Sequence, residues 1–135
     1  MPGDERAEEV DAWLSRARSD LRAAQVLLAA APPLPGDAAF HCQQAVEKAL
    51  KALLTYHDHV FPKTHDLGML AMGCLRFEPG LEDLLRIAAP LTEYAWRFRY
   101  PGESFEPPVD EVNDALAIGS EVVTAVASRV GRSGD

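Results

Sequence analysis

The sequence lacks the features of a membrane-spanning, secreted or disulfide-stabilised protein. No apolar run approaches the roughly 18 to 20 residues that span a bilayer, and the start, Met-Pro-Gly-Asp-Glu-Arg, has neither the basic nor the apolar segment of a signal peptide. The two cysteines, Cys42 and Cys74, form no CxxC pair and suit neither a disulfide framework nor a zinc site. We therefore expect a cytoplasmic protein in which both cysteines are small, buried core residues.

Motifs of nucleotide-hydrolysing and acyl-transfer enzymes are also missing. The chain has no GxGxxG after a strand, no GxxxxGK[ST] and no GxSxG, and neither cysteine has an obvious histidine partner. A metal site has little support, because His57 and His59 would point in nearly opposite directions on a helix and no HExxH or i, i+4 ligand pair occurs. His65, beside Thr64 and Asp66, is expected instead to end a loop and start a short helix. The sequence thus predicts no metal and no cofactor.

The size and charge of the chain limit the remaining possibilities. Its 135 residues suit a single domain, residues 1–135, with a core at about 5–130 and a tail at 131–135. Apolar residues make up 47% and charged residues 25%, as in ordinary globular proteins. The formal net charge of −8 repels nucleic acid at long range and argues against a non-specific DNA coat. Any anion site has to be built from a few converging basic side chains.

Apolar residues recur at three- and four-residue steps, the period of amphipathic helices, and no segment alternates with the period of a strand. Four long helices are expected, at about residues 5–30, 37–57, 81–97 and 108–130. Asp37 is the expected N-cap of the second, Thr64 can cap a short extra helix, and Pro90 should kink or split the third long one. The simplest packing is an all-α, antiparallel up-and-down four-helix bundle with one additional short helix.

The second long segment carries a polar stripe opposite its apolar face. The stripe consists of His41, Gln44, Lys48, Lys51 and Thr55, which fall within a narrow sector of the helical wheel. Solvated helix faces commonly have this composition. The uncharged glutamine and the histidine beside lysines leave a second interpretation, in which the stripe lines a groove or a subunit interface.

The stretch Arg97-Phe98-Arg99-Tyr100-Pro101-Gly102 is the most suggestive part of the sequence. If helical geometry continues through Arg99, this arginine lies on the face that points into the bundle. A buried guanidinium needs an acidic partner or an anionic ligand, because an unpaired buried charge is costly. One interpretation is an internal ion pair, for example with Glu47. The other is an arginine aimed at a phosphate or a nucleobase in a cleft.

Three motifs, in this order, resemble those of the HEPN family. They are the run from Phe40 to Leu53, the run from Pro62 to Leu67, and Leu91-Thr92-Glu93-Tyr94-Ala95 followed by Arg99-Tyr100-Pro101. The resemblance covers roughly residues 5 to 130. It implies a four-helix bundle that typically dimerises and is often encoded beside a minimal nucleotidyltransferase, in prokaryotic toxin-antitoxin, defence or stress systems. The sequence is similar to the Arg-Tyr-Pro branch, for which nucleotide, RNA or partner-protein binding is the usual suggestion.

Many members of this family are metal-independent ribonucleases that use an arginine followed, after four to six residues, by a histidine. In such chemistry the histidine moves protons for attack by the 2′-hydroxyl and the arginine stabilises phosphate charge. No histidine follows Arg97 or Arg99 at that spacing, and every histidine lies at position 65 or earlier. The ribonuclease signature is therefore absent. An active enzyme would need His41 or His65 to reach Arg99 in space, for example across a dimer.

The sequence and the resemblance together predict a homodimeric binding module rather than an enzyme. The expected cleft, for a nucleotide, an RNA phosphate or a partner nucleotidyltransferase, is formed by Arg97, Arg99, Tyr100, Gln44, Glu47 and Lys48. A first alternative is a metal-independent toxin ribonuclease whose candidate catalytic residues are His41, His65 and Arg99. A second is a structural partner protein that binds no small ligand.

Overall fold

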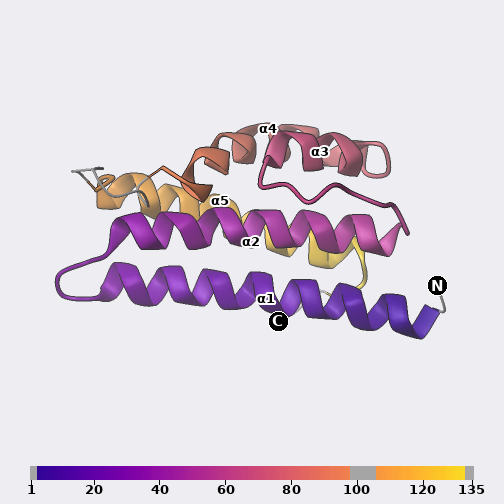
Figure 1. Cartoon of the computed structure of the whole chain (residues 1–135), viewed down its shortest axis with the longest axis horizontal. Helices are drawn as coiled ribbons and strands as arrows, with labels where there is room; N and C mark the ends of the chain where they lie inside the picture. Colours follow the sequence, from indigo (N-terminus) through magenta and orange to yellow (C-terminus); the bar gives the residue numbers. More distant parts are fainter. Residues whose placement is uncertain (1–2, 98–105, 133–135) are drawn as a thin grey trace.

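The computed structural model describes residues 3–97 and 106–132, and all the regular secondary structure in this part of the chain is helical (Figure 1). Its elements are α1 (Gly3–Ala29), α2 (Pro35–Tyr56), α3 (Leu67–Leu75), the 3₁₀ helix η1 (Pro79–Leu81), α4 (Glu82–Ala88), the 3₁₀ helix η2 (Ala89–Ala95) and α5 (Val109–Arg129). The prediction of an all-α fold is confirmed. None of these helices has the length and apolar character that crossing a membrane requires.

The central element is α2, which contacts α1, α5, α3 and η2. α1 runs antiparallel to α2, the row formed by α4 and η2 runs back in the direction of α1, and α5 runs in the direction of α2 (Figure 1). These directions and contacts fit the predicted bundle, although its third member is divided into short helices. Because neighbours surround α2, most of its residues are buried, including the polar Gln43, Glu47 and Thr55.

Pro90 divides the third member of the bundle, as the sequence predicts. α4 ends at Ala88, and Pro90 lies in the first turn of the tighter 3₁₀ helix η2. Proline lacks the amide proton for an i to i−4 bond, so the α-helix cannot continue unchanged through it. Because η2 ends at Ala95, the condition for the predicted inward orientation of Arg99, helical geometry that continues unbroken to that residue, is not met. Arg99 and Tyr100 themselves lie outside the described residues.

The predicted N-cap of α2 is wrong. Asp37 lies within the first turn, and the helix begins at Pro35 after Leu34, without a side-chain cap from a neighbouring residue. A carboxylate from far along the chain takes that role, since the Gly36 amide donates a 2.7 Å hydrogen bond to Glu106 Oε2. Helix N-termini carry unpaired amides and a partial positive charge, and any suitably placed carboxylate can satisfy them.

The cap of α3 is also displaced from its predicted position. Asp66, and not Thr64, is the N-cap, and its carboxylate accepts a 3.2 Å hydrogen bond from the Met69 amide. The Thr64 hydroxyl oxygen accepts from the Asp66 amide at 3.0 Å and so shapes the turn that precedes the helix. The structure therefore confirms a short helix after the loop, with its start two residues later than the cap predicts.

Both cysteines are buried in the core, as predicted, and burial raises the pKa of the Cys42 and Cys74 thiols to about 12. Beside Cys42, α5 approaches α1 and α2 closely at Gly119, which is buried. A Cβ atom at this position would lie 3.2 Å from Leu21 Cδ2 and 3.6 Å from the Cys42 carbonyl oxygen. The absence of a side chain thus sets how closely α5 can pack.

Replacement of Gly119 by valine is expected to lower the free energy of unfolding by about 1–3 kcal/mol, because the added branches overpack this contact. Gly119→Ala is the matched control. Its gain in helix propensity, about 1 kcal/mol, should offset a small shift of the flexible Leu21 side chain. Urea unfolding followed by circular dichroism measures both changes, and equal stability of the valine variant and the wild type would contradict the close packing.

Candidate functional site

A buried carboxylate, Glu47 of the central helix α2, forms hydrogen bonds with several polar side chains. Its side chain is only 5% exposed. Lys51 Nζ donates to its Oε2 atom at 2.9 Å, and Gln43 Nε2 donates to its Oε1 atom at 3.1 Å. Helical steps of four residues place these three side chains on one side of α2. His65, from the segment before α3, completes the cluster, with its Nδ1 atom 2.7 Å from Glu47 Oε1.

Gln43 fixes the position of the segment that carries His65. It is fully buried, and its amide nitrogen also donates to the His65 carbonyl oxygen at 3.1 Å. Its own oxygen accepts a 2.7 Å hydrogen bond from Gln44 Nε2. Gln43 is not among the site residues predicted from the sequence. The available signal was a polar residue one turn before Glu47 in a largely apolar stretch.

The environment of Glu47 favours its charged form. Burial alone raises the pKa of this carboxyl, but hydrogen bonds from Lys51, His65 and Gln43, together with the charge of Lys51, outweigh burial and lower the pKa below its usual value. The site therefore contains a carboxylate that one lysine neutralises and to which one histidine is bound.

His65 is the exposed member of this cluster. Its side chain is 68% exposed although its inner ring nitrogen is held by Glu47. Its outer nitrogen, Nε2, has no hydrogen-bond partner within residues 3–97 and 106–132. When Nδ1 donates to the carboxylate, Nε2 of the neutral ring can accept a proton, and in the charged ring it can donate to an anion.

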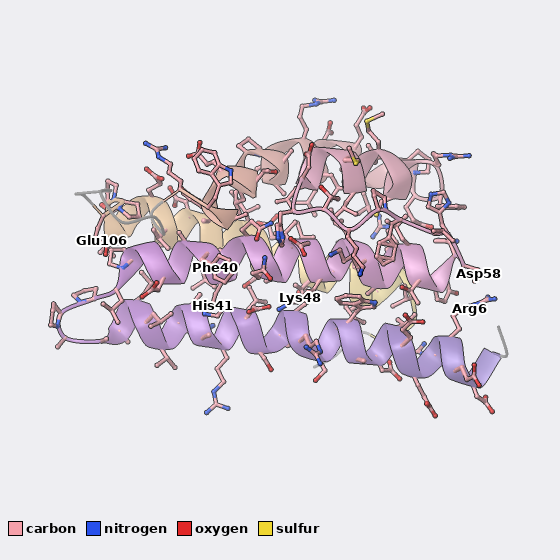
Figure 2. All side chains as sticks on the ribbon, viewed as in Figure 1. Arg6, Phe40, His41, Lys48, Asp58 and Glu106 are labelled. Carbon is pink, nitrogen blue, oxygen red and sulfur yellow. The ribbon has the colours of Figure 1, made fainter. Side chains whose placement is uncertain are left out.

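A second buried carboxylate organises the neighbouring part of α2. Asp20 of α1 is 9% exposed at its side chain, and Lys48 Nζ donates to its Oδ2 atom at 2.6 Å. His41 Nδ1 lies 2.8 Å from Asp20 Oδ1, and the His41 ring is 32% exposed. Figure 2 shows His41 and Lys48 between α1 and α2. Asp20 carries no distinctive signal in the sequence, because acidic residues are spread along the whole of α1.

The polar stripe of α2 is therefore not an ordinary solvated face. Thr55 is buried, and the other members are hydrogen-bonded to Asp20, Glu47 or Gln43. The interpretation of a freely hydrated stripe is wrong, since α1 and the segment before α3 supply partners for it. Whether the stripe lines a groove for a ligand or a subunit interface stays a prediction.

The structure unites only some of the predicted ligand-binding residues. Gln44 and Glu47 belong to the His65 cluster, whereas Lys48 belongs to the Asp20 cluster. Arg97 Nη1 donates to Glu93 Oε1 at 2.7 Å, in an i, i+4 ion pair near the end of η2. The predicted roles of Arg99 and Tyr100 fall outside the described residues. Across the part of the chain that is described, no three metal-ligating side chains converge.

Two hydrogen bonds hold η2 in place, one to the segment that carries His65 and one to α5. Thr92 Oγ1 accepts a 3.0 Å hydrogen bond from the Leu67 amide, two residues after His65. The Tyr94 hydroxyl donates to the Glu111 carboxylate and so fastens η2 to α5. Burial, followed by the hydrogen bond to and the charge of Glu111, raises the pKa of Tyr94, which stays protonated as a donor. η2, the last described helix before residues 98–105, is therefore anchored both to the segment that carries His65 and to α5.

Acidification is expected to lower the free energy of unfolding, because it protonates the Glu47 carboxylate. The pKa of Glu47 is lower in the folded chain than in the unfolded one. Its contribution to the free energy of unfolding is therefore complete above the ordinary pKa of 4.5, and it is lost as the pH falls through the pKa of the folded chain. Glu47→Gln should lower the free energy of unfolding at neutral pH by roughly 1.5–3 kcal/mol. It should also flatten the acid-induced fall, as measured by urea unfolding at a series of pH values.

Glu121→Gln, at an exposed position of α5, is the matched control and should keep the wild-type pH profile. An unchanged acid-induced fall in Glu47→Gln would assign the effect to another group.

Comparison with known proteins places the chain in a family. Residues 10–130 match the model of the HEPN domain, and this range contains the Glu47, His65 and Asp20 clusters. No curated protein and no solved structure gives a significant match. The match spans most of the chain and confirms the prediction from the sequence motifs: the chain belongs to the HEPN domain family.

Proposed function

We propose that this HEPN domain is a binding module for a nucleotide or RNA, and that it holds a phosphate group beside His65. The observation that carries the proposal is the state of the His65 ring, which Glu47 fixes through Nδ1 although 68% of the side chain is exposed. A ring that is already ordered loses little conformational entropy on binding. Its outer nitrogen, when protonated, forms a charge-assisted hydrogen bond to a phosphate oxygen. Family membership supports a nucleotide- or RNA-related function.

The charges around His65 indicate which residues complete the phosphate site. The Lys51 charge is matched by Glu47, and the Lys48 charge is matched by Asp20. In a chain of net charge −8, an anion site needs cations beyond these two pairs. We therefore assign the phosphate contacts to His65, Arg99 and Tyr100.

Three further residues have supporting roles in this proposal. Gln44 supplies an amide beside Glu47, and Lys48 and Arg97, which form ion pairs with Asp20 and Glu93, supply donor groups rather than net positive charge.

The proposal also includes partners. HEPN domains often dimerise, and we propose a cytoplasmic homodimer that associates with a minimal nucleotidyltransferase in a toxin-antitoxin or defence system. The resemblance of the motifs to the Arg-Tyr-Pro branch supports this part. A nucleotidyltransferase that co-purifies with the protein, without any nucleotide in the complex, would favour a purely structural partnership instead.

His65→Asn is expected to weaken binding of ATP and of a short mixed-sequence RNA by about tenfold or more, the loss typical of a charged hydrogen bond. The asparagine amide can still donate to Glu47, so the cluster keeps its internal hydrogen bond while the outer nitrogen is removed. Isothermal titration calorimetry measures the affinity, and circular dichroism verifies the fold. Unchanged affinity in this variant would remove His65 from the site.

Arg99→Ala is expected to abolish nucleotide or partner binding and to leave the helical circular-dichroism signal intact. Arg86→Ala is the matched control, because Arg86 lies on α4, is 68% exposed and pairs only loosely with Glu82 and Asp83. It should bind as the wild type does. Global unfolding of Arg99→Ala would support the internal ion-pair interpretation instead.

The same cluster favours a second candidate function, a metal-independent ribonuclease with a rearranged acid-base pair. A histidine whose inner nitrogen is bound to a carboxylate can act as a general base, because the carboxylate orients the ring and stabilises its charged form. In this alternative His65 takes the proton of the 2′-hydroxyl, Glu47 positions His65, and Arg99 stabilises phosphate charge. His41, which Asp20 holds in a similar way, is the second candidate base.

Incubation of the purified protein with mixed cellular RNA, without metal, distinguishes the two functions. The binding module leaves RNA intact, as does Arg99→Ala. The ribonuclease yields fragments that end in cyclic phosphates, arrests growth on expression, and loses cleavage in Arg99→Ala. Cleavage that persists after both His41→Ala and His65→Ala would eliminate both candidate bases.

A further inference from the structure

An aromatic pair adjoins the His65 cluster. Trp13 of α1 and Phe61, from the segment after α2, pack edge to face with ring centroids 6.4 Å apart. Lys51 Nζ lies 5.5 Å from the centroid of Trp13 and 5.9 Å from that of Phe61. The same ammonium group donates to Glu47, the residue that holds His65. Lys51 thus links the aromatic pair to the proposed phosphate site through direct contacts.

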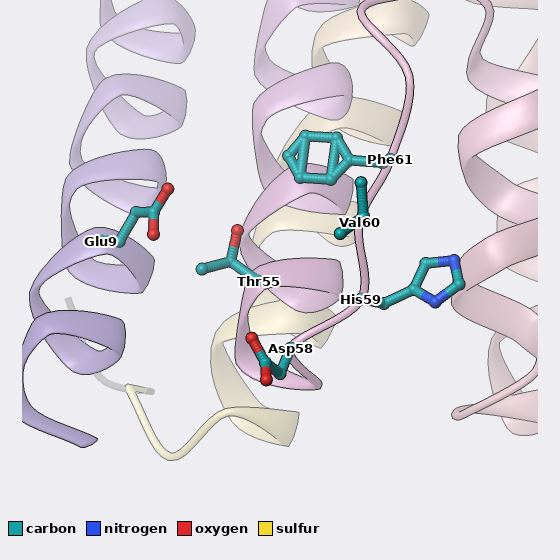
Figure 3. Close-up of a pocket in the computed structure, with 6 residues that line it drawn as sticks. All are labelled: Glu9, Thr55, Asp58, His59, Val60 and Phe61. Atoms are coloured by element: carbon teal, nitrogen blue, oxygen red, sulfur yellow. The ribbon is translucent and has the colours of Figure 1, made fainter. Parts of the chain in front are cut away.

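Two hollows flank this aromatic pair and share Glu9 of α1. The first, of about 270 Å³, is lined by Glu9, Ala12, Trp13 and Arg16. The second, of about 220 Å³, lies between α1 and the end of α2 (Figure 3). In that view Glu9 extends from α1 toward Thr55 of α2, and Phe61 lies on the segment that follows α2. The two hollows therefore meet at Glu9, and the described residues that line the hollow at Trp13 all belong to α1.

The polar groups beside Trp13 are unpaired. Within the described part of the chain, neither Glu9 nor Arg16 has a hydrogen-bond or ion-pair partner. Steps of four and three residues place Glu9, Trp13 and Arg16 on one side of α1. The hollow thus combines an aromatic ring, a free acceptor and a free donor. Nucleobases offer the complementary features, because each has a π-face for stacking and an edge with donors and acceptors.

We propose that the hollow at Trp13 is a nucleobase subsite. The base stacks on the indole ring, and Glu9 and Arg16 bind its polar edge. The phosphate of the same nucleotide lies at His65, on the other side of Lys51. This inference rests on the proposed function and assigns the part of the ligand that the phosphate site does not recognise.

Fluorescence of Trp13 tests the subsite directly. The chain has two tryptophans, and Trp96→Phe leaves Trp13 as the only one. In this variant, AMP and GMP are expected to quench the indole emission, because a stacked base contacts the ring. Ribose 5-phosphate, which has the phosphate but no base, should compete with AMP without quenching. Unchanged emission at saturating AMP would overturn the proposal.

Affinity measurements give an independent readout. Trp13→Leu keeps apolar bulk against Phe61 but removes the stacking face, so it should weaken AMP binding by about tenfold. Its affinity for ribose 5-phosphate should stay the same, and Trp13→Phe should recover most of the loss. Equal AMP affinity in the wild type and in Trp13→Leu would also overturn the proposal. If Trp13→Leu fails to fold, the fluorescence titration still decides.

Two different results would contradict the nucleobase subsite alone and the proposed function as a whole. AMP binding that depends on His65 but not on Trp13 leaves the phosphate site intact and removes only the nucleobase subsite. Absence of binding of AMP, GMP and ribose 5-phosphate to the wild-type protein overturns both.

Discussion

The charge of Glu47, buried inside the central helix, is the constraint on which the site depends. A carboxylate that is 5% exposed is tolerated only if nearly all of its hydrogen-bonding capacity is used, and here Lys51, His65 and Gln43 use it. Any displacement of the segment before α3 relative to α2 would leave this charge incompletely paired. Core packing and the position of the exposed His65 ring are therefore coupled through one side chain.

Asp20 repeats the arrangement at the contact between α1 and α2. Its carboxylate holds Lys48 and His41, so a buried acid again presents a partly exposed imidazole at the surface. The two acids neutralise the lysines of α2 and order the histidines, and the result is a polar face that is rigid rather than strongly basic. Such a face suits recognition of a specific anion more than general attraction of nucleic acid, in agreement with the acidic balance of the chain.

The binding and ribonuclease hypotheses use the same geometry. The absence of a histidine four to six residues after an arginine therefore does not by itself decide between them, because His65 comes from another part of the chain. A histidine held by a carboxylate is suited both to a phosphate contact and to proton transfer. The difference lies in whether a 2′-hydroxyl reaches the outer nitrogen of His65, because both hypotheses place Arg99 at the phosphate. In both hypotheses, that nitrogen is the point at which this HEPN domain would contact a ligand.

Local periodicity in the sequence determined the helices, the break at Pro90, the burial of both cysteines and, through three ordered motifs, the family. The helices and the break depend on residues within a turn or two of one another, and the motifs are read directly from the order of residues, so neither requires the tertiary structure. Only the tertiary structure decided that Glu106 caps α2, that Asp20 binds His41 and that Glu47 binds His65, across 70, 21 and 18 positions of the chain respectively. A carboxylate binds whichever donor the packing brings within about 3 Å, and separation along the chain carries no record of that distance.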